Sequence, residues 1–363
     1  MTDVLNDPEP RLLQWLDLAI ANDASDLHLV SGYPPILRTH GKLIPIGSEP
    51  PLESQNMWDL LSPVVENIAA ERLVEWKDLD FAIELNRSAV MRRFRVNLFR
   101  SNRTIGGCIR IIPRSIPDFS WTSFPEELAR RLVALNSGLV LFTGVTGSGK
   151  STSLAMIIEV LNKKGGYRIL TIEDPIEYRF PIYSNSVVTQ REVGTDVDSF
   201  ADGLRFGLRQ DPDLILVGEI RDLETARMAL SAAETGHLVL ATLHTRDAKG
   251  AISRYADIFP QQMQSEVRSQ LATNLRAIIC QRLLASIIEG EKQELALEIL
   301  FNTHAISSAI RTSKLESIDN GILTGRTEGM LSMDESIKRL LGDSRITRAT
   351  AEAFITDRAV LNI

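Results

Sequence analysis

The sequence predicts an α/β protein in which a small antiparallel α+β domain precedes a larger domain with a parallel sheet. Its 363 residues leave room for two domains. A phosphate-loop pattern at residues 144–151 lies between a strand-like and a helix-like segment. From Gly138 onward, strand-like and helix-like segments alternate, which is typical of a parallel sheet with helices on both faces. Before that point, short segments with period-two alternation favour an antiparallel sheet.

Residues 1–113 form the predicted first domain. The elements expected there are a helix over residues 12–20 and strands over residues 26–30, 35–43, 94–98 and 108–112. In the last two strands the apolar residues share one face, so Arg95 and Arg110 lie on the opposite face. Residues 114–125 read as a linker because prolines interrupt them and apolar repeats are few.

Residues 126–363 form the predicted second domain. Its expected elements are strands at 138–143, 168–172, 214–217 and 237–243, with helices in the gaps that include 199–209 and 223–234. From about residue 261 the chain is predicted to be mostly helical. The apolar residues that predict a helical core face there, at three-to-four spacing, are Met263, Val267, Leu271, Leu275 and Ile278.

Composition excludes several classes of protein. A net charge of −7 gives no support for a nucleic-acid surface, although a local basic patch stays open. Two cysteines, Cys108 and Cys280, exclude a four-cysteine zinc module and a disulfide framework. No signal-peptide pattern is present, and no apolar run approaches the roughly 20 residues of a membrane span. We therefore expect a cytoplasmic protein that meets a membrane complex only through a partner.

The phosphate loop carries the clearest chemistry. Its residues, with the first of the following helix, are Gly144, Val145, Thr146, Gly147, Ser148, Gly149, Lys150, Ser151 and Thr152. Backbone N–H groups of such a turn point inward, and the helix dipole favours an anion there. Lys150 is predicted to reach the β- and γ-phosphates of a nucleoside triphosphate, and the Ser151 hydroxyl to help hold Mg²⁺.

Two carboxylates follow predicted strands. Glu173 ends the strand over 168–172, at the rim where open α/β sheets bind ligands, and is a candidate to deprotonate an attacking water. The alternative is an acid that only caps the next turn. Glu219 follows four apolar residues and Gly218, which fits the strand whose carboxylate reaches Mg²⁺.

Histidines and arginines supply further candidates. His237 and His244 flank the strand over 238–243, and each is either a γ-phosphate sensor or a structural donor. Arg205 and Arg209 lie four residues apart and would share a helix face, as phosphate-neutralising groups or as a solvated surface. For Arg95 and Arg110 the alternatives are an arginine finger in a neighbouring subunit and an ordinary surface charge. These alternatives stay open on the residues alone.

Taken together, these stretches resemble the secretion-superfamily ATPases, in particular the PilT/PilU-type twitching-motility ATPases of type IV pili. The matching stretches include the phosphate loop, an aspartate box, a Walker B and a histidine box. They occupy residues 24–29, 93–97, 144–151, 172–178, 190–194, 208–213, 217–225, 233–237 and 242–245. Their occurrence in this order makes the resemblance specific, and it extends from about residue 12 to about residue 350.

The resemblance implies a PAS-like first domain and a RecA-like ATPase domain with a helical end, assembled as a homohexamer. It implies ATP and Mg²⁺ as cofactors, an inner-membrane pilus or secretion platform protein as partner, and pilus retraction as the function. The related alternatives are a motor of a type II or type IV secretion system and an accessory module with little turnover.

The implied roles follow the matching positions. Glu173 is the catalytic glutamate and Glu219 the Mg²⁺-linked one, while His244 and His237 sense phosphate. The arginines expected to complete the site are Arg95, Arg110, Arg205 and Arg209.

One departure concerns the carboxy-terminal motif of retraction ATPases, Ala-Ile-Arg-Asn-Leu-Ile-Arg-Glu. Here only residues 309–311 match it, and Thr312 follows. The resemblance therefore leaves open which kind of motor this chain is.

Overall fold

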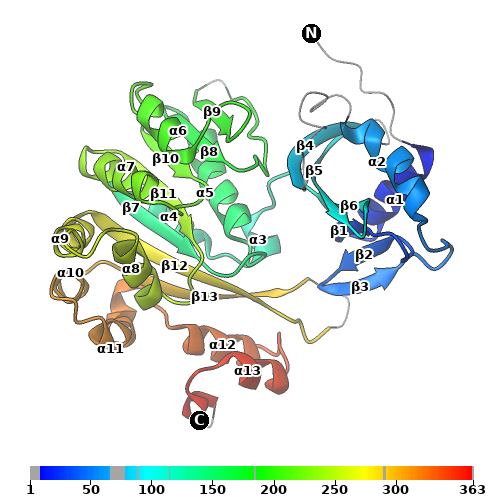
Figure 1. Ribbon diagram of the computed structural model, residues 1–363. Coiled ribbons are helices and arrows are strands. Elements are labelled where there is room, and N and C mark those ends of the chain that lie inside the picture. Colours follow the sequence, from blue (N-terminus) through cyan, green and yellow to red (C-terminus); the bar gives the residue numbers. More distant parts are fainter. Residues whose placement is uncertain are drawn as a thin grey trace. The chain divides into compact units, whose positions relative to one another are not determined.

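The computed structural model describes residues 9–65, 78–87, 90–113, 115–183, 185–288 and 292–361. It divides into two units, Met1–Ser115 and Ile116–Ile363 (Figure 1). The division lies two residues beyond the predicted end of the first domain. Among the residues that the structure describes, no helix combines the length and apolar composition that a membrane span needs.

The first unit is a six-stranded sheet with helices on one face, in strand order β3-β2-β1-β6-β5-β4. The strands are β1 (Ala24–Leu29), β2 (Ile36–Thr39), β3 (Lys42–Pro45), β4 (Asp78–Arg87), β5 (Val90–Ser101) and β6 (Thr104–Ile111). The helices are α1 (Pro10–Ala21), α2 (Met57–Val65) and the short 3-10 helix η1 (Ser54–Asn56). All neighbouring strands pair antiparallel, so the predicted antiparallel sheet is confirmed.

One face of this sheet forms the core of the first unit. Trp15 of α1 and Phe94 of β5 are buried in one cluster with Leu27 and Ile109. Since side chains alternate along a strand, Arg95 and Arg110 lie on the other face, as the pattern predicts.

The second unit contains a seven-stranded sheet in the order β13-β12-β7-β11-β10-β8-β9. The strands are β7 (Gly138–Thr143), β8 (Arg168–Glu173), β9 (Val187–Glu192), β10 (Leu214–Val217), β11 (Leu238–Leu243), β12 (Leu275–Leu284) and β13 (Glu294–Phe301). All neighbours are parallel except β13, which runs antiparallel to β12. Strands β7, β10 and β11 are buried throughout, as expected of continuous apolar runs in a sheet covered on both faces.

Helices alternate with these strands and pack along the sheet (Figure 1). Up to β12 they are α3 (Phe119–Thr122), α4 (Glu126–Val133), α5 (Lys150–Lys164), α6 (Phe200–Gly207), α7 (Leu223–Glu234), α8 (Ala248–Asp257) and α9 (Gln264–Asn274). After β13 they are α10 (His304–Arg311), α11 (Glu316–Thr324), η2 (Gly325–Glu328), α12 (Met333–Gly342), α13 (Arg348–Phe354) and η3 (Arg358–Leu361). Because each helix returns the chain between parallel strands, the carboxyl ends of β7, β8, β10 and β11 lie at one edge of the sheet.

Two expectations differ from the structure. The helical stripe predicted from residue 261 is wrong beyond Asn274, because Leu275 and Ile278 lie in β12, a buried strand whose apolar run continues the spacing of α9. The segment predicted as a linker contains α3, capped by Asp118, whose Oδ1 accepts from the Trp121 N–H at 2.7 Å. Phe124 of the same segment is buried in the core of the second unit.

Candidate active site

The phosphate loop connects β7 to α5, as the pattern predicts. Gly144 follows the last residue of β7, and Gly149 precedes Lys150, the first residue of α5. Gly144 has a φ of 146°, and a Cβ there would lie 2.5 Å from both the Gln281 carbonyl oxygen and Ser148 Oγ. Only glycine fits this position, so the loop keeps the tight turn that directs its N–H groups inward.

Lys150 lies inside the loop. Its Nζ donates to the carbonyl oxygens of Gly144 at 2.7 Å and Val145 at 3.1 Å, and the residue is 8% exposed. Burial lowers its pKa, while the negative charges of Glu219 and Glu177 oppose that shift. The two carboxylates thus lie close enough to act on the lysine of the loop.

The predicted groups at the sheet edge are brought together by strand order. Strands β8, β10, β11 and β7 are successive neighbours, and all are parallel. Glu173 is the last residue of β8, Glu219 lies two residues after β10, His244 follows β11 directly, and Gly144 follows β7. Four separate stretches of sequence therefore meet around the phosphate loop.

Glu173 is held by two side chains. Thr171 Oγ1 donates to its Oε1 at 2.6 Å, and Gln190 Nε2 donates to the same oxygen at 3.2 Å. Burial raises the pKa of Glu173 to about 7, and the hydrogen bonds from Thr171 and Gln190 oppose that rise. A carboxyl that titrates near neutral pH is suited to accept a proton.

Glu219 lies between an arginine and a histidine. Its Oε2 lies 2.6 Å from Arg221 Nη2 and its Oε1 lies 3.1 Å from His244 Nε2. Burial alone would raise its pKa, but Arg221 and His244 outweigh this effect and hold the pKa below its ordinary value. Glu219 therefore stays ionised, as a cation ligand must.

His237 lies at the other edge of the sheet. It precedes Leu238, the first residue of β11, so the six residues of that strand separate it from His244. At about 3.3 Å per residue, this places it on the order of 20 Å from the edge that holds the phosphate loop. The structure does not bring His237 to the loop of its own chain.

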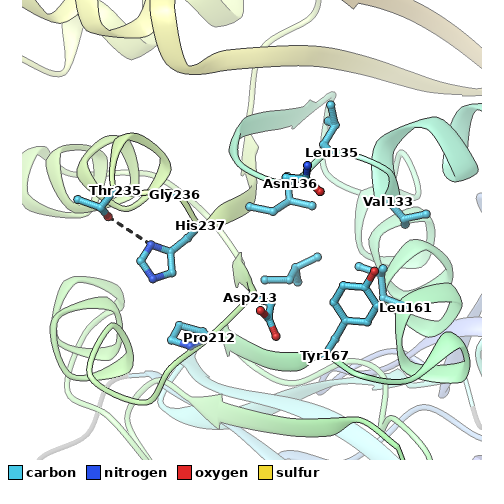
Figure 2. Close-up of a pocket in the computed structure, with 12 residues that line it drawn as sticks. Val133, Leu135, Asn136, Leu161, Tyr167, Pro212, Asp213, Thr235, Gly236 and His237 are labelled. Carbon is cyan, nitrogen blue, oxygen red and sulfur yellow. Dashed lines mark hydrogen bonds between the residues drawn. The ribbon is translucent and has the colours of Figure 1, made fainter.

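Figure 2 shows the surroundings of His237, a cavity of about 230 Å³. Several of its polar side chains already take part in hydrogen bonds of the fold. His237 Nδ1 lies 3.0 Å from the Ala232 carbonyl oxygen and 3.2 Å from Thr235 Oγ1. The Asp213 carboxylate accepts from the Arg168 N–H at 2.7 Å. The histidine here anchors the turn that leads into β11.

Arg205 and Arg209 do not share a helix. Helix α6 ends at Gly207, and Arg209 lies in the turn that follows, because Asp211 with a φ of 54° and Pro212 redirect the chain. Arg205 pairs with Asp202 and with Glu224 on α7. The shared helix face predicted for the two arginines is wrong.

Arg95 and Arg110 lie in the first unit, directly opposite each other on β5 and β6. Arg95 Nε donates to Asp80 Oδ1 at 3.0 Å, and Arg110 Nε donates to Asp26 Oδ1 at 2.9 Å. The two arginines thus belong to a charged face of this sheet.

Three residues of the site had no predicted role. Thr171 was detectable, because it lies two residues before Glu173 on the same strand face. Arg221 lies two residues after Glu219 in a turn, where the spacing in the sequence does not show which way a side chain points. Gln190 lies on β9, a strand that the sequence pattern did not predict.

Comparison with known proteins identifies a family that the chain matches. A family described as "Type II/IV secretion system protein" matches residues 59–345. The chain is 41% identical to the type IV pilus retraction ATPase PilT of Pseudomonas aeruginosa over 340 residues, covering 94% of this chain and 96% of that protein. It is 35% identical to the type IV pilus ATPase PilU of the same organism over 338 residues, covering 93% and 87%. A crystal structure of the pilus retraction motor PilT with bound ADP matches with a TM-score of 0.81 at 39% identity, covering 96% of this chain and 98% of that one.

Proposed function

Because the chain belongs to the type II/IV secretion system protein family, we propose that it is a Mg²⁺-dependent ATP hydrolase that drives type IV pilus retraction. The observation that carries the proposal is the convergence of Lys150, Glu173, Glu219 and His244 at one edge of the sheet. The similarity to PilT over 94% of the chain supports the choice of machine.

The phosphate loop is proposed to hold the triphosphate through its N–H groups and Lys150. Ser151 and Glu219 are the proposed Mg²⁺ ligands. They fit this metal because it prefers oxygen donors, with few carboxylates and the remaining positions filled by phosphate and water. The ionised state of Glu219, maintained by Arg221 and His244, supports this choice. When bound, Mg²⁺ would neutralise charge on the phosphates.

Glu173 is the proposed general base, and His244 the proposed phosphate sensor. His244 lies beside Glu219 at the edge of the loop, whereas His237 lies at the opposite edge. We therefore assign the sensor role within one chain to His244 alone.

We further propose a homohexamer in which the first unit is PAS-like and the second RecA-like. Arg95 and Arg110 would serve a neighbouring subunit's site, which their position on the face away from the core of the first unit supports. Arg205 lies on α6, and a role in phosphate neutralisation would require it to leave Asp202 and Glu224. The hexamer would act in the cytoplasm on an inner-membrane platform protein, without nucleic acid.

A second candidate is a motor of a type II or type IV secretion machine. It is favoured by one observation: the match to the retraction motif stops at Arg311, the residue where α10 ends, and Ser313 then turns the chain with a φ of 57°. The two candidates share the site and differ in the partner.

The site is tested with three variants. Lys150→Ala should weaken ATP binding, because it removes the charge that meets the β- and γ-phosphates. Glu173→Gln should bind ATP but lose about 10²–10⁴-fold in turnover. In EDTA, Glu219→Gln should bind ATP with the same affinity as the parent. Addition of Mg²⁺ should increase the affinity of the parent but not that of the variant. Calorimetric titration and phosphate release measure these effects, and turnover of Glu173→Gln within a few-fold of the parent would refute the assignment.

The proposed role in pilus retraction is tested in a twitching bacterium that lacks its own retraction ATPase. The chain should restore twitching, and Glu173→Gln should not. If the parent hydrolyses ATP but fails to restore twitching, while it restores export in a strain that lacks a secretion ATPase, the second candidate replaces the first.

A further inference from the structure

Three side chains of neighbouring strands share one face of the sheet at the end of β8. Thr171 and Glu173 lie two residues apart on β8, so their side chains point to the same side. Gln190 lies on β9, at the register position of Thr171. Thr171 is fully buried, so its hydroxyl needs a partner within the protein.

Both donors end on one atom of Glu173. The Thr171 hydroxyl, at 2.6 Å, and the Gln190 amide, at 3.2 Å, donate to Oε1. Neither of these bonds engages Oε2. Two donors that converge on one oxygen restrict rotation of the carboxylate and orient the other oxygen.

Gln190 is itself fixed by the chain that follows Glu173. Its Nε2 donates to the Tyr178 carbonyl oxygen at 2.7 Å, and its Oε1 accepts from the Phe180 N–H at 3.1 Å. Tyr178 in turn meets Thr152 of α5 through its hydroxyl at 2.9 Å. The amide is therefore held in one orientation and tied to the start of the helix that carries the phosphate loop.

We propose that Thr171 and Gln190 are positioning residues that hold Glu173 Oε1, so that Oε2 receives the proton of the attacking water. This rests on the proposed function. In that step the water oxygen forms a bond to the γ-phosphorus as its proton passes to Oε2. The bond from the γ-phosphorus to the bridging oxygen breaks, and its electron pair stays on ADP. In this role Thr171 and Gln190 act through Glu173 and take no part in the proton transfer.

The same hydrogen bonds set how much of Glu173 is ionised. Burial raises its pKa to about 7, and the negative charge of Glu177 acts in the same direction. The hydrogen bonds from Thr171, from Gln190 and from the backbone of Glu177 lower it. On β9, Glu192 lies opposite Glu173 and accepts from the Ile176 N–H at 3.0 Å. Removal of either donor therefore raises the pKa of Glu173 further and reduces the ionised base at neutral pH.

The test compares Thr171→Val and Gln190→Met, which keep shape but lose the donor, in the full-length protein. At pH 6.5 each should lower kcat for ATP about tenfold, since a shift of one pKa unit is a factor of ten below the pKa. KM for ATP should change little. At pH 9 the loss should shrink to within about threefold, so the acid limb of the profile moves to higher pH. Thr171→Ser, which keeps the hydroxyl, should recover most of kcat.

Thr189→Val provides a matched control, because Thr189 lies next to Gln190 on the other face of β9. A purely structural role for Thr171 and Gln190 predicts the same loss at every pH and no recovery in Thr171→Ser, and that combination would overturn the proposal. Unchanged pH profiles of kcat in both variants would also overturn the proposal. If Glu173→Gln is inactive in the same assay, this outcome leaves the proposed function intact. Full turnover of Glu173→Gln would instead remove the proposed function itself.

Discussion

At the scale of single residues, Glu173, the proposed general base, lies in an environment that disfavours its charged form. Its carboxyl ends a buried strand and keeps only part of its surface open to solvent. A pKa of about 7 means that the folded chain binds a proton there more tightly than the unfolded chain does. Between about pH 4.5 and 7, the ionisation of Glu173 therefore costs stability as pH rises.

Replacement of Glu173 by glutamine should remove this cost. Below about pH 4.5 the variant and the parent should differ little, because both carry a neutral side chain. As pH rises to 7 the variant should become more stable, by at most about 3 kcal/mol, which corresponds to the 2.5-unit difference from 4.5. Urea unfolding without nucleotide at pH 4.5, 6 and 8 measures this. Glu127→Gln, on the exposed start of α4, controls for the lost charge, and a gain equal at all pH values would contradict the prediction.

Some residues of the candidate site could be predicted from the sequence, and others could not. Lys150 follows from its motif, and Glu173 and Glu219 from strands that end at a shared edge. Gln190 could not be found this way, because its role depends on β9 lying beside β8, a pairing between segments that sequence patterns do not specify. His237 was grouped with His244 because both flank one predicted strand, although the two ends of a strand lie at opposite edges of the sheet.

At the scale of elements, buried apolar runs predict strands well but do not always distinguish them from helices. The predicted bounds of β7, β10 and α7 agree with the structure. The end of α9 was missed because the apolar positions Leu271 and Leu275 keep helical spacing across the junction with β12. A strand buried on both faces carries no polar alternation that would reveal the change of period.

Helix α6 packs against β8 through glycine. A Cβ on Gly207 would lie 2.2 Å from Leu170 Cδ2, and one on Gly203 would lie 2.8 Å from Ile172 Cγ2. Leu170 and Ile172 are fully buried, so they have no free space in which to move. The close approach of α6 thus depends on the absence of side chains at two positions four residues apart.

Gly207→Ala should therefore destabilise the protein by about 1–3 kcal/mol, the usual cost of overpacking a core. Gly342→Ala is the matched control, since Gly342 also ends a helix, α12, and a Cβ there meets nothing within 4 Å. The control should be neutral or stabilising by up to about 1 kcal/mol. Thermal or urea unfolding measures the stability of both variants. Equal changes in stability would show that α6 can move away from β8 without loss of stability.

At the scale of the whole molecule, the chain divides its charged groups between two units. The phosphate loop and its carboxylates belong to the second unit, and the face with Arg95 and Arg110 belongs to the first. The sequence predicted this division from a change in strand pattern near residue 113. It could not give the ion pairs of these arginines with Asp80 and Asp26, which depend on strand register.

If the arginines serve another subunit, two inactive variants should complement each other. Mixtures of Arg95→Ala or Arg110→Ala with Lys150→Ala should recover part of the ATPase activity, since some neighbouring pairs then combine an intact loop with intact arginines. Activity should also rise cooperatively with protein concentration. A mixture that stays inactive, with ring assembly confirmed by light scattering, would mean that each chain completes its own site.

Two threonines connect the strands on which the site is built. Thr143 Oγ1 lies 2.7 Å from the Thr245 carbonyl oxygen and 2.6 Å from Thr245 Oγ1, and it accepts from the Thr245 N–H at 2.9 Å. These hydrogen bonds hold the residue before the phosphate loop and the residue after His244 together. Thr245 Oγ1 also donates to the carbonyl oxygen of Asp247, which caps α8. A shift of the phosphate loop would therefore act on α8 through these polar contacts, and Lys249 Nζ of that helix lies 2.9 Å from Glu316 Oε2 on α11.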